Sequence, residues 1–344
     1  MDRLPPRIVR RLILAPLVFL LCLALIAISP ALLLLAAVAD LFLPGNWRTL
    51  RLVGFGVVYL IFEVIGLLVM FGLWVGSGFG LRLKTAEVQE WHYRFMTRWL
   101  YAMYRAVAFF FGLKIHIEDR PKPQPGPILV FCRHAGPGNS LMLVGTMMIA
   151  YNRRPRIVML AKLQWDPLFD TMGNRLPNRF IKHDKKSSAK YVAAIGDLAT
   201  GLRAQDAFVL FPEGRDFTKS LRVRAITYLR EKGFAVHADR AEQMMNVLPP
   251  RHRGPLAAIT SAPQADVVFV AHSVLEEIGT FKELWSRIPL TDPIDARYWR
   301  IPPNEVPRTE PELIDWLYHW WERIDQWINE HKDEELVTTA SSKG

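Results

Sequence analysis

Two long apolar segments near the start of the chain constrain its fold more than any other feature. Residues 12–39 contain no charged side chain, and residues 52–81 contain only one, Glu63. A helix over the first segment would be about 42 Å long at about 1.5 Å per residue, longer than the roughly 30 Å hydrocarbon core of a bilayer. The sequence Pro44-Gly45-Asn46 marks a turn between the two segments. We therefore expect an N-terminal membrane helical hairpin over residues 1–85, which either spans the bilayer or enters it from one side.

The charges that flank this hairpin indicate its orientation. The only cations in the connection between the two segments are Arg48 and Arg51. The cations outside them are Arg3, Arg7, Arg10, Arg11, Arg82, Lys84, Arg94, Arg98 and Arg105. The positive-inside rule places both ends, and the chain that follows, on the cytoplasmic side of the membrane. Because Glu63 has no cation at a matching depth, we expect it near an interface or in the contact between the helices rather than in a functional role.

The composition of the 344-residue chain excludes several classes of protein. Hydrophobic residues make up 51% and charged residues 22%, so the chain is not disordered. Its two cysteines, Cys22 and Cys132, exclude a disulfide framework and a cysteine-based zinc site. The net charge of +10 favours a phosphate-bearing partner, which is nucleic acid, an anionic lipid or a phosphorylated substrate.

The segment 89–113 favours lipid among these partners, since its aromatic residues are interspersed with cations such as Arg94, Arg98 and Arg105. This composition suits a helix in the lipid headgroup layer, although a surface that stacks nucleic-acid bases has a similar composition. Because two apolar segments precede it, we expect an interfacial helix with membrane lipids as partners and no nucleic acid.

Short apolar stretches and longer helical stretches alternate from about residue 114. This alternation predicts an α/β domain over residues 86–332, with a largely parallel central sheet flanked by helices. A last helix is expected at 310–331, where a stripe of tryptophans favours docking on the core over membrane contact. A flexible tail is expected at 333–344. The predicted strands are 128–132, 157–161, 208–211 and 267–270, and the other predicted helices are 187–203 and 219–232.

Sites in parallel α/β sheets gather at the carboxyl ends of the strands, and two predicted strand ends carry suggestive residues. In the segment 131–140, His134 and Asn139 flank a Gly-Pro-Gly turn. Histidine is a natural general base near neutral pH, a group five residues later could reach its second ring nitrogen, and the helix start could bind an anion. The alternatives are an incidental loop histidine and a helix N-cap at Asn139 or Ser140.

In the second segment, 208–215, an apolar strand runs into Pro212-Glu213-Gly214-Arg215. The turn would hold Glu213, and the planar guanidinium of Arg215 can bind a phosphate. An ordinary turn is the alternative interpretation. Other cations in this half of the chain are more typical of a solvated surface: Lys182, Lys185, Lys186, Lys219, Arg222 and Arg224.

Together the two loops resemble the glycerolipid acyltransferase family, the 1-acylglycerol-3-phosphate acyltransferases. That family has His, four residues and Asp in its first block, and Phe-Pro-Glu-Gly in a later one. The matching residues here are His134 and Phe211-Pro212-Glu213-Gly214, followed by Arg215. Two further blocks correspond to the segment 161–183, which contains Lys162 and Gly173, and to Val247-Leu248-Pro249-Pro250. The resemblance covers roughly residues 90–275, and an N-terminal membrane hairpin is common in the family.

The resemblance implies a membrane-bound acyltransferase of phospholipid biosynthesis or remodelling. It would move a fatty acyl group from an acyl-CoA or acyl-carrier-protein thioester to the free hydroxyl of lysophosphatidate or a related lysophospholipid. His134 would be the general base, Asn139 would accept a hydrogen bond from its Nδ1–H, and Glu213, Gly214, Arg215 and Lys162 would bind the acceptor. No metal or further cofactor is implied. We expect Cys132 to be buried in a strand, which makes it a poor nucleophile.

The sequence departs from the family pattern at three positions. Asn139 stands where the family has Asp, Lys182 or His183 stands where it has an Arg, and Arg215 follows Gly214 directly. An Asn amide can orient a histidine, but it cannot stabilise the imidazolium as a carboxylate does. A membrane-anchored pseudoenzyme that binds lysophospholipid without turnover is therefore the alternative function.

Overall fold

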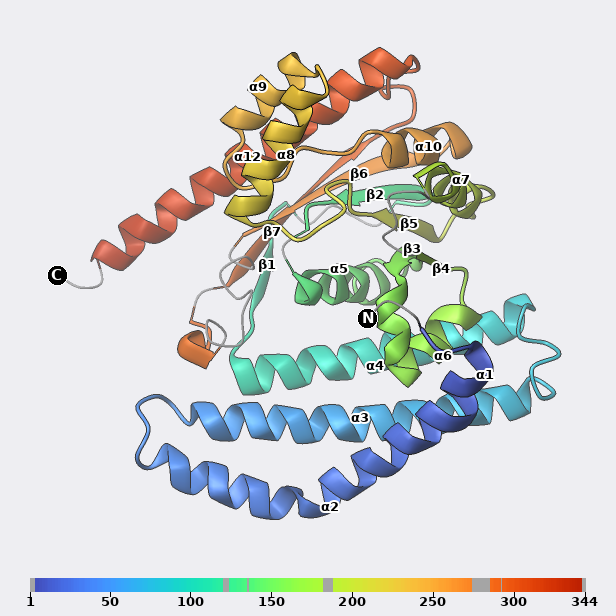
Figure 1. Ribbon diagram of the computed structural model, residues 1–344, viewed down its shortest axis with the longest axis vertical. Helices are drawn as coiled ribbons and strands as arrows, with labels where there is room; N and C mark the ends of the chain where they lie inside the picture. The colour runs from blue at the N-terminus through green and yellow to red at the C-terminus, as the bar shows by residue number, and fades with distance from the viewer. Residues whose placement is uncertain are drawn as a thin grey trace.

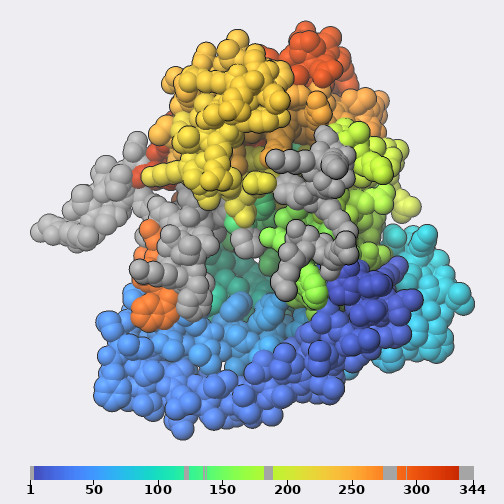
Figure 2. All heavy atoms as spheres, in the orientation of Figure 1, coloured from blue at the N-terminus to red at the C-terminus, as the bar shows by residue number. Residues whose placement is uncertain are grey.

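A computed structural model describes residues 4–119, 124–134, 136–181, 188–273, 285–291 and 293–341. The elements form stacked layers, with the N-terminal helices on the outside and a mixed sheet covered by helices on both faces (Figure 1). In the space-filling view the N-terminal helices form a continuous surface along one side of the molecule (Figure 2).

The two apolar segments form the expected helical hairpin. A short helix α1 (Arg7–Val9) and a π-helical turn η1 (Arg10–Leu14) lead into α2 (Ala15–Asp40), and α3 (Arg48–Gly76) returns along it (Figure 1). Both long helices, the first counted from Arg7, are apolar enough over a sufficient length to cross a membrane. Large side chains of α2 stay exposed, among them Leu17, Leu20 and Leu34. A bilayer would cover this apolar face, so the structure suggests membrane association.

Helix α4 (Ala86–Phe111) lies between the hairpin and the rest of the molecule (Figure 1). Its aromatic residues divide between buried and exposed positions, and its location in the lipid headgroup layer stays a prediction. Tyr93 and Trp99 are buried, whereas Tyr101 and Phe109 are exposed. The buried rings face protein because α3 packs along one side of α4 and α5 (Pro137–Ile149) along another.

The central sheet has seven strands in the order β1-β7-β6-β2-β5-β3-β4. All neighbouring strands are parallel except β6 and β7, which are antiparallel. The largely parallel sheet expected from the sequence is therefore confirmed. The strands are β1 (Ile115–Ile117), β2 (Ile128–Cys132), β3 (Arg154–Leu160), β4 (Arg179–Ile181), β5 (Asp206–Leu210), β6 (Asp266–His272) and β7 (Ile294–Ile301).

Helices bury both faces of the central strands. On one face, Phe131 and Phe269 belong to a core completed by side chains of α7 (Ser188–Ala199), α10 (Arg253–Ser261) and α12 (Glu310–Ser341). On the other face, Val130 and Cys132 contact apolar residues of α5. Strands covered on both faces read as continuous apolar stretches, which is why they could be located from the sequence. Cys132 is fully buried, as expected.

The tryptophan stripe of α12 docks on the sheet, as the sequence favoured. Trp321 is fully buried, and the Trp320 ring stacks on Phe269 with 4.8 Å between centroids. Helix α12 continues to Ser341, past the point where a flexible tail was expected. The two remaining helices on this side, α8 (Lys219–Glu231) and α9 (Ala235–Gln243), lie opposite the hairpin (Figures 1 and 2).

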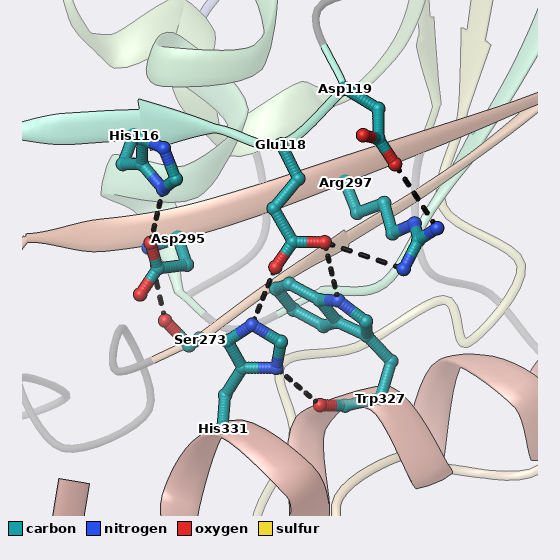
Figure 3. Close-up of polar contacts among 8 residues, drawn as sticks. All are labelled: His116, Glu118, Asp119, Ser273, Asp295, Arg297, Trp327 and His331. Carbon is teal, nitrogen blue, oxygen red and sulfur yellow. Dashed lines mark hydrogen bonds and ion pairs between the residues drawn. The ribbon is translucent and has the colours of Figure 1, made fainter. Parts of the chain in front are cut away.

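A polar cluster fastens α12 to the edge of the sheet (Figure 3). Glu118, directly after β1, receives a hydrogen bond from Trp327 Nε1 at 3.1 Å and lies 2.5 Å from His331 Nε2. Arg297 of β7 pairs with the same carboxylate at 3.4 Å. The His116 and Asp295 side chains also meet here, 2.9 Å apart, while Ser273 Oγ accepts a hydrogen bond from the Asp295 backbone N–H. These contacts join β1, β7 and α12, and we assign the cluster a structural role.

Candidate active site

The two loops that the sequence singled out meet at one edge of the sheet. Strands β2 and β5 are parallel neighbours with Phe131 opposite Leu210, so their carboxyl ends emerge side by side. The backbone N–H of His134 donates to Glu213 Oε1 at 3.4 Å. The backbone oxygen of His134 accepts from the Phe217 N–H at 2.8 Å. Residues about 80 positions apart are therefore joined into one site.

The loop after β5 also fixes the orientation of His134. Both backbone polar groups of His134 are held by residues of that loop, the N–H by Glu213 and the oxygen by Phe217. The imidazole ring stacks on Phe211 with 4.5 Å between centroids. The loop after β5 therefore sets both the backbone position and the ring plane of the candidate base.

The His134 ring lies next to one carboxylate and one ammonium group. Nε2 is 3.3 Å from Asp216 Oδ1, whereas Nδ1 is buried without a hydrogen-bond partner among the described residues. Burial lowers the pKa of His134 below its ordinary value of 6.5, the Asp216 charge opposes this shift, and the Lys162 charge adds to it. His134 is therefore neutral at pH 7, the state that a general base requires.

Asn139 is placed differently from the expectation. Its Nδ2 donates a hydrogen bond to the backbone oxygen of Arg133 at 2.8 Å, and the residue is only 3% exposed. The expected hydrogen bond from His134 Nδ1 to the Asn139 amide oxygen is not found among the described residues. A carbonyl oxygen can only accept, so the NH₂ group of Asn139 must face it, and Asn139 secures the loop between β2 and α5.

Glu213 and Gly214 form the turn after β5. Glu213 is 2% exposed, and burial raises the pKa of its carboxyl to about 8 although the Arg133 guanidinium opposes the shift. Gly214 has φ of +69°, a backbone conformation that favours glycine, and a Cβ there would lie 3.4 Å from Arg251 Nη1. The glycine thus lets the Arg251 side chain lie close over the turn.

Two cations accompany this turn. Arg215 follows Gly214 and is exposed, and the Arg251 N–H donates to the Pro212 backbone oxygen at 2.9 Å. Burial and the nearby Arg215 charge lower the pKa of Arg251. Arg251 directly follows the Val247-Leu248-Pro249-Pro250 block, and it was not predicted as a site residue. The two guanidinium groups form a cationic pair suited to an anionic substrate group.

Lys162 reaches the site from a third loop. It lies exposed on the short 3₁₀ helix η2 (Ala161–Trp165), near enough for its charge to act on His134. Helix α6 (Pro167–Arg175) follows, and Asp166 caps it by accepting from the Phe169 N–H at 2.8 Å. The Tyr59 hydroxyl of α3 donates to the same Asp166 side chain at 3.0 Å. The loop that carries Lys162 is therefore tied to the hairpin.

Two other predicted features lie along this connection. Glu63 is buried, and its Oε1 accepts from the Leu168 N–H at 3.3 Å, so it contacts the start of α6. Gly173 allows α6 to approach β4, because a Cβ there would lie 2.6 Å from Phe180 Cζ. Four further residues considered from the sequence lie outside the described residues: Lys182, His183, Lys185 and Lys186.

Three more residues of this site were not predicted from the sequence. Arg133 is fully buried, and its guanidinium donates to the backbone oxygens of His272 at 3.0 Å and Asn246 at 2.7 Å. His272, at the end of β6, is also buried, and burial together with Arg133 holds its pKa well below the ordinary value. Asp216 could have been found as the acid following Phe-Pro-Glu-Gly-Arg. No sequence pattern marked Arg133 or His272 as site residues, because their burial results from the pairing of strands that are distant in the sequence.

The described residues contain no group of three or more His, Cys, Asp or Glu side chains that could hold a metal ion. The site instead combines a neutral histidine, a carboxylate beside it and several cations at the carboxyl ends of parallel strands. Such an arrangement can accept a proton from a hydroxyl group and bind a phosphate in the same place.

The comparisons with known proteins agree with this chemistry. A family model described as Acyltransferase matches residues 114–274, a range that contains every predicted site residue. The fold is similar to the crystal structure of the 1-acyl-sn-glycerophosphate (LPA) acyltransferase PlsC from Thermotoga maritima, with a TM-score of 0.52 at 13% sequence identity. That match covers 82% of this chain and 96% of the other. A comparison with curated proteins gives no significant match.

The chain is therefore an acyltransferase. The family-model match over residues 114–274 and the PlsC-like fold support the resemblance to the glycerolipid acyltransferases that the sequence blocks indicated.

Proposed function

We propose that this enzyme transfers a fatty acyl group from an acyl-CoA or acyl-carrier-protein thioester to the free hydroxyl of lysophosphatidate or a related lysophospholipid. The observation that carries the proposal is the position of His134 between Asp216 and the Glu213-Gly214-Arg215 turn, inside the acyltransferase domain. The similarity to PlsC, a 1-acyl-sn-glycerophosphate acyltransferase, supports the choice of substrate class. A binding protein without turnover is not favoured, because Asp216 supplies the carboxylate that Asn139 lacks.

In the proposed reaction the His134 imidazole takes the hydroxyl proton while the acceptor oxygen attacks the thioester carbonyl carbon. Asp216 Oδ1, 3.3 Å from Nε2, stabilises the imidazolium that forms. The tetrahedral intermediate collapses with cleavage of the carbon–sulfur bond, and the departing thiolate receives the proton from His134. The products are the acylated lipid and the free thiol. No step requires a cofactor beyond the thioester co-substrate.

The cations around the turn are proposed to bind the acceptor phosphate. Arg215 and Arg251 flank Gly214, and Lys162 approaches His134 from the loop after β3. A phosphate held here would place the adjacent glycerol hydroxyl near the imidazole. Buried Glu213 is proposed to hold the turn and the His134 backbone through its contact with the His134 N–H.

The experiment that tests this function is an acyl-transfer assay with purified full-length enzyme. Labelled acyl-CoA and acyl-carrier protein are each offered with lysophosphatidate, lysophosphatidylglycerol, lysophosphatidylcholine and lysocardiolipin. We expect labelled diacyl product with at least one acceptor, and a loss of about 10²–10⁴-fold or more in His134→Ala. An unchanged melting temperature of the variant would assign the loss to chemistry. Activity of His134→Ala within a few-fold of wild type would remove this residue from the mechanism.

We further propose that the hairpin anchors the enzyme in the membrane with the catalytic domain on the cytoplasmic side. The length and apolarity of the two N-terminal helices and the flanking cations support this location. Carbonate washing of cell membranes should leave the full-length chain in the pellet, and protease added to the cytoplasmic face should cleave the domain after α4. Release of most of the protein by carbonate would contradict the anchor.

A further inference from the structure

The start of the hairpin lies next to α6 (Figure 1). A cluster of arginines surrounds one carboxylate there. Arg10 Nη2 pairs with Asp170 Oδ1 at 2.8 Å, and Arg11 Nε lies 3.5 Å from Asp170 Oδ2. Asp170 is 1% exposed and Arg10 is also buried. The N-terminal end of the hairpin is therefore fixed to the catalytic domain through a buried ion pair.

Arg175, at the end of α6, brings a further positive charge into this cluster. It is buried, and its Nη1 donates to the Met70 backbone oxygen at 2.6 Å. His92 Nδ1 lies 2.7 Å from the Val88 oxygen and must donate to it, so His92 Nε2 is the acceptor that faces Arg175 at 3.4 Å. The hydrogen-bond contacts of Arg175 are thus with neutral groups of Met70 and His92. Burial and the charges of Arg11 and Arg7 lower the pKa of Arg175 to about 10.

The positive charges in this cluster exceed the negative ones. Among the residues that the structure describes, the ion pairs formed by Arg10 and Arg11 involve only Asp170. Four guanidinium nitrogens are buried without a hydrogen-bond partner among those residues: Arg10 Nε, Arg11 Nε, Arg11 Nη2 and Arg175 Nε. Of these, Arg11 Nε still lies 3.5 Å from Asp170 Oδ2. Unpaired buried donors on charged groups are costly. An anion bound among these side chains would satisfy the donors and neutralise the excess charge.

The position of the cluster indicates which anion would reach it. Arg7, Arg10 and Arg11 immediately precede the uncharged segment that starts at Leu12. In a membrane-bound chain this boundary lies at the level of the lipid headgroups, where phosphates are abundant and arginines bind them as planar forks.

We propose that Arg7, Arg10, Arg11 and Arg175 form a binding site for the phosphate of an anionic glycerophospholipid of the surrounding bilayer. This inference rests on the membrane location proposed above. The lipid would be a structural ligand rather than a substrate, since the site lies between α1, η1 and α6, whereas the proposed acceptor cations flank Gly214. Binding would hold the hairpin and α6 together and so stabilise the loop that carries Lys162.

The test measures thermal unfolding of the full-length protein in a non-ionic detergent. The added probes are dihexanoyl phosphatidylglycerol, dihexanoyl phosphatidylcholine and inorganic phosphate. We expect saturable stabilisation by phosphatidylglycerol and much less by the other two. Arg11→Gln should weaken the apparent affinity at least tenfold, and Arg7→Gln about fivefold. Arg7 is exposed, so we expect Arg7→Gln to fold. The affinity of this variant for phosphatidylglycerol therefore still tests the site if Arg11→Gln fails to fold.

Arg82→Gln is the matched control, since Arg82 is an exposed cation that also flanks the hairpin but pairs with Glu87. It should bind phosphatidylglycerol like wild type. Equal losses in Arg7→Gln and Arg82→Gln, or equal stabilisation by phosphatidylcholine, would overturn the site. Stabilisation by inorganic phosphate alone would overturn the lipid as its source. His134→Ala should lose acyl transfer but keep the stabilisation by phosphatidylglycerol. An error in the proposed catalytic function can therefore be distinguished from an error in the proposed lipid site.

Discussion

Asp216 Oδ1 lies 3.3 Å from His134 Nε2, although the two residues belong to loops that follow different strands. The contact exists because β2 and β5 are parallel neighbours whose carboxyl ends emerge together. Asp216 is also held by the Gly136 N–H, which donates to the same Oδ1 at 3.0 Å. A carboxylate at this place can stabilise a protonated imidazole, a role that the resemblance had assigned to the position of Asn139.

Replacing Asp216 with Asn should lower turnover without unfolding the domain. The Asp216 side chain is 53% exposed, so solvent screens its charge, and we expect a loss of about 10–100-fold rather than the roughly 10⁴-fold known for a buried protease aspartate. Steady-state kinetics and thermal melting are the measurements. Asp239→Asn, which changes an exposed carboxylate of α9 that pairs with Arg230, is the control. Turnover of Asp216→Asn within twofold of wild type would exclude the stabilising role.

Replacing Asn139 should affect stability more than chemistry. Its Nδ2 donates to the buried Arg133 backbone oxygen, so Asn139→Ala should cost about 1–3 kcal/mol of the free energy of unfolding. Asn139→Asp should restore the family residue but place a carboxylate against that oxygen. Only a protonated carboxyl could donate there, so this variant should lose stability as pH rises. The free energy of unfolding of Asn139→Asp, measured with denaturant at pH 5 and pH 8, checks this pH dependence. Higher turnover of Asn139→Asp with unchanged stability would contradict the structural role of Asn139.

The activity should depend on pH through His134. Because burial lowers its pKa, the acid limb of kcat/KM should lie below pH 6.5. Asp216 raises this pKa and Lys162 lowers it, so Asp216→Asn should move the limb to lower pH and Lys162→Gln to higher pH. A lowered folded-state pKa also means that the folded enzyme loses stability as pH falls through the unfolded value near 6.5. Shifts of both variants in the same direction would be inconsistent with this assignment.

Replacing Arg215 with Ala should weaken acceptor binding more than donor binding. The acceptor phosphate is proposed to lie between Arg215 and Arg251, and loss of one charge-assisted contact should cost roughly 1.5–3 kcal/mol, about 10–150-fold in acceptor KM. Arg224→Ala, an exposed cation on α8, is the control. KM values for both substrates, measured for lysophosphatidate and acyl-CoA, decide the matter. An equal rise in the two, or a rise for the donor alone, would count against the phosphate site.

The apolar stretches of the sequence were sufficient to predict the N-terminal hairpin and the central strands of the sheet. Uninterrupted apolar runs can satisfy their backbone only as helices in a bilayer or inside a core, so the hairpin followed from residues 12–39 and 52–81. The central strands are covered on both faces, and their continuous apolar stretches were therefore visible. The first and last strands, β1 and β7, were not predicted, since β1 has only three residues and β7 alternates polar with apolar side chains.

Which side chains share the site depends on how the strands pair and how the loops turn, and this could not be predicted from the sequence. His134 and the Glu213 turn could be named from their sequence blocks, but the partner of His134 could not. Strand pairing brings Asp216 to its ring, while the local geometry of the turn before α5 directs Asn139 to the Arg133 backbone oxygen. Tyr93 and Trp99 of α4 are likewise buried by packing against α3 and α5, which composition cannot show. The spacing of residues in the sequence shows only which of them are neighbours along the chain. The contacts of His134 depend instead on which strands are neighbours in the sheet.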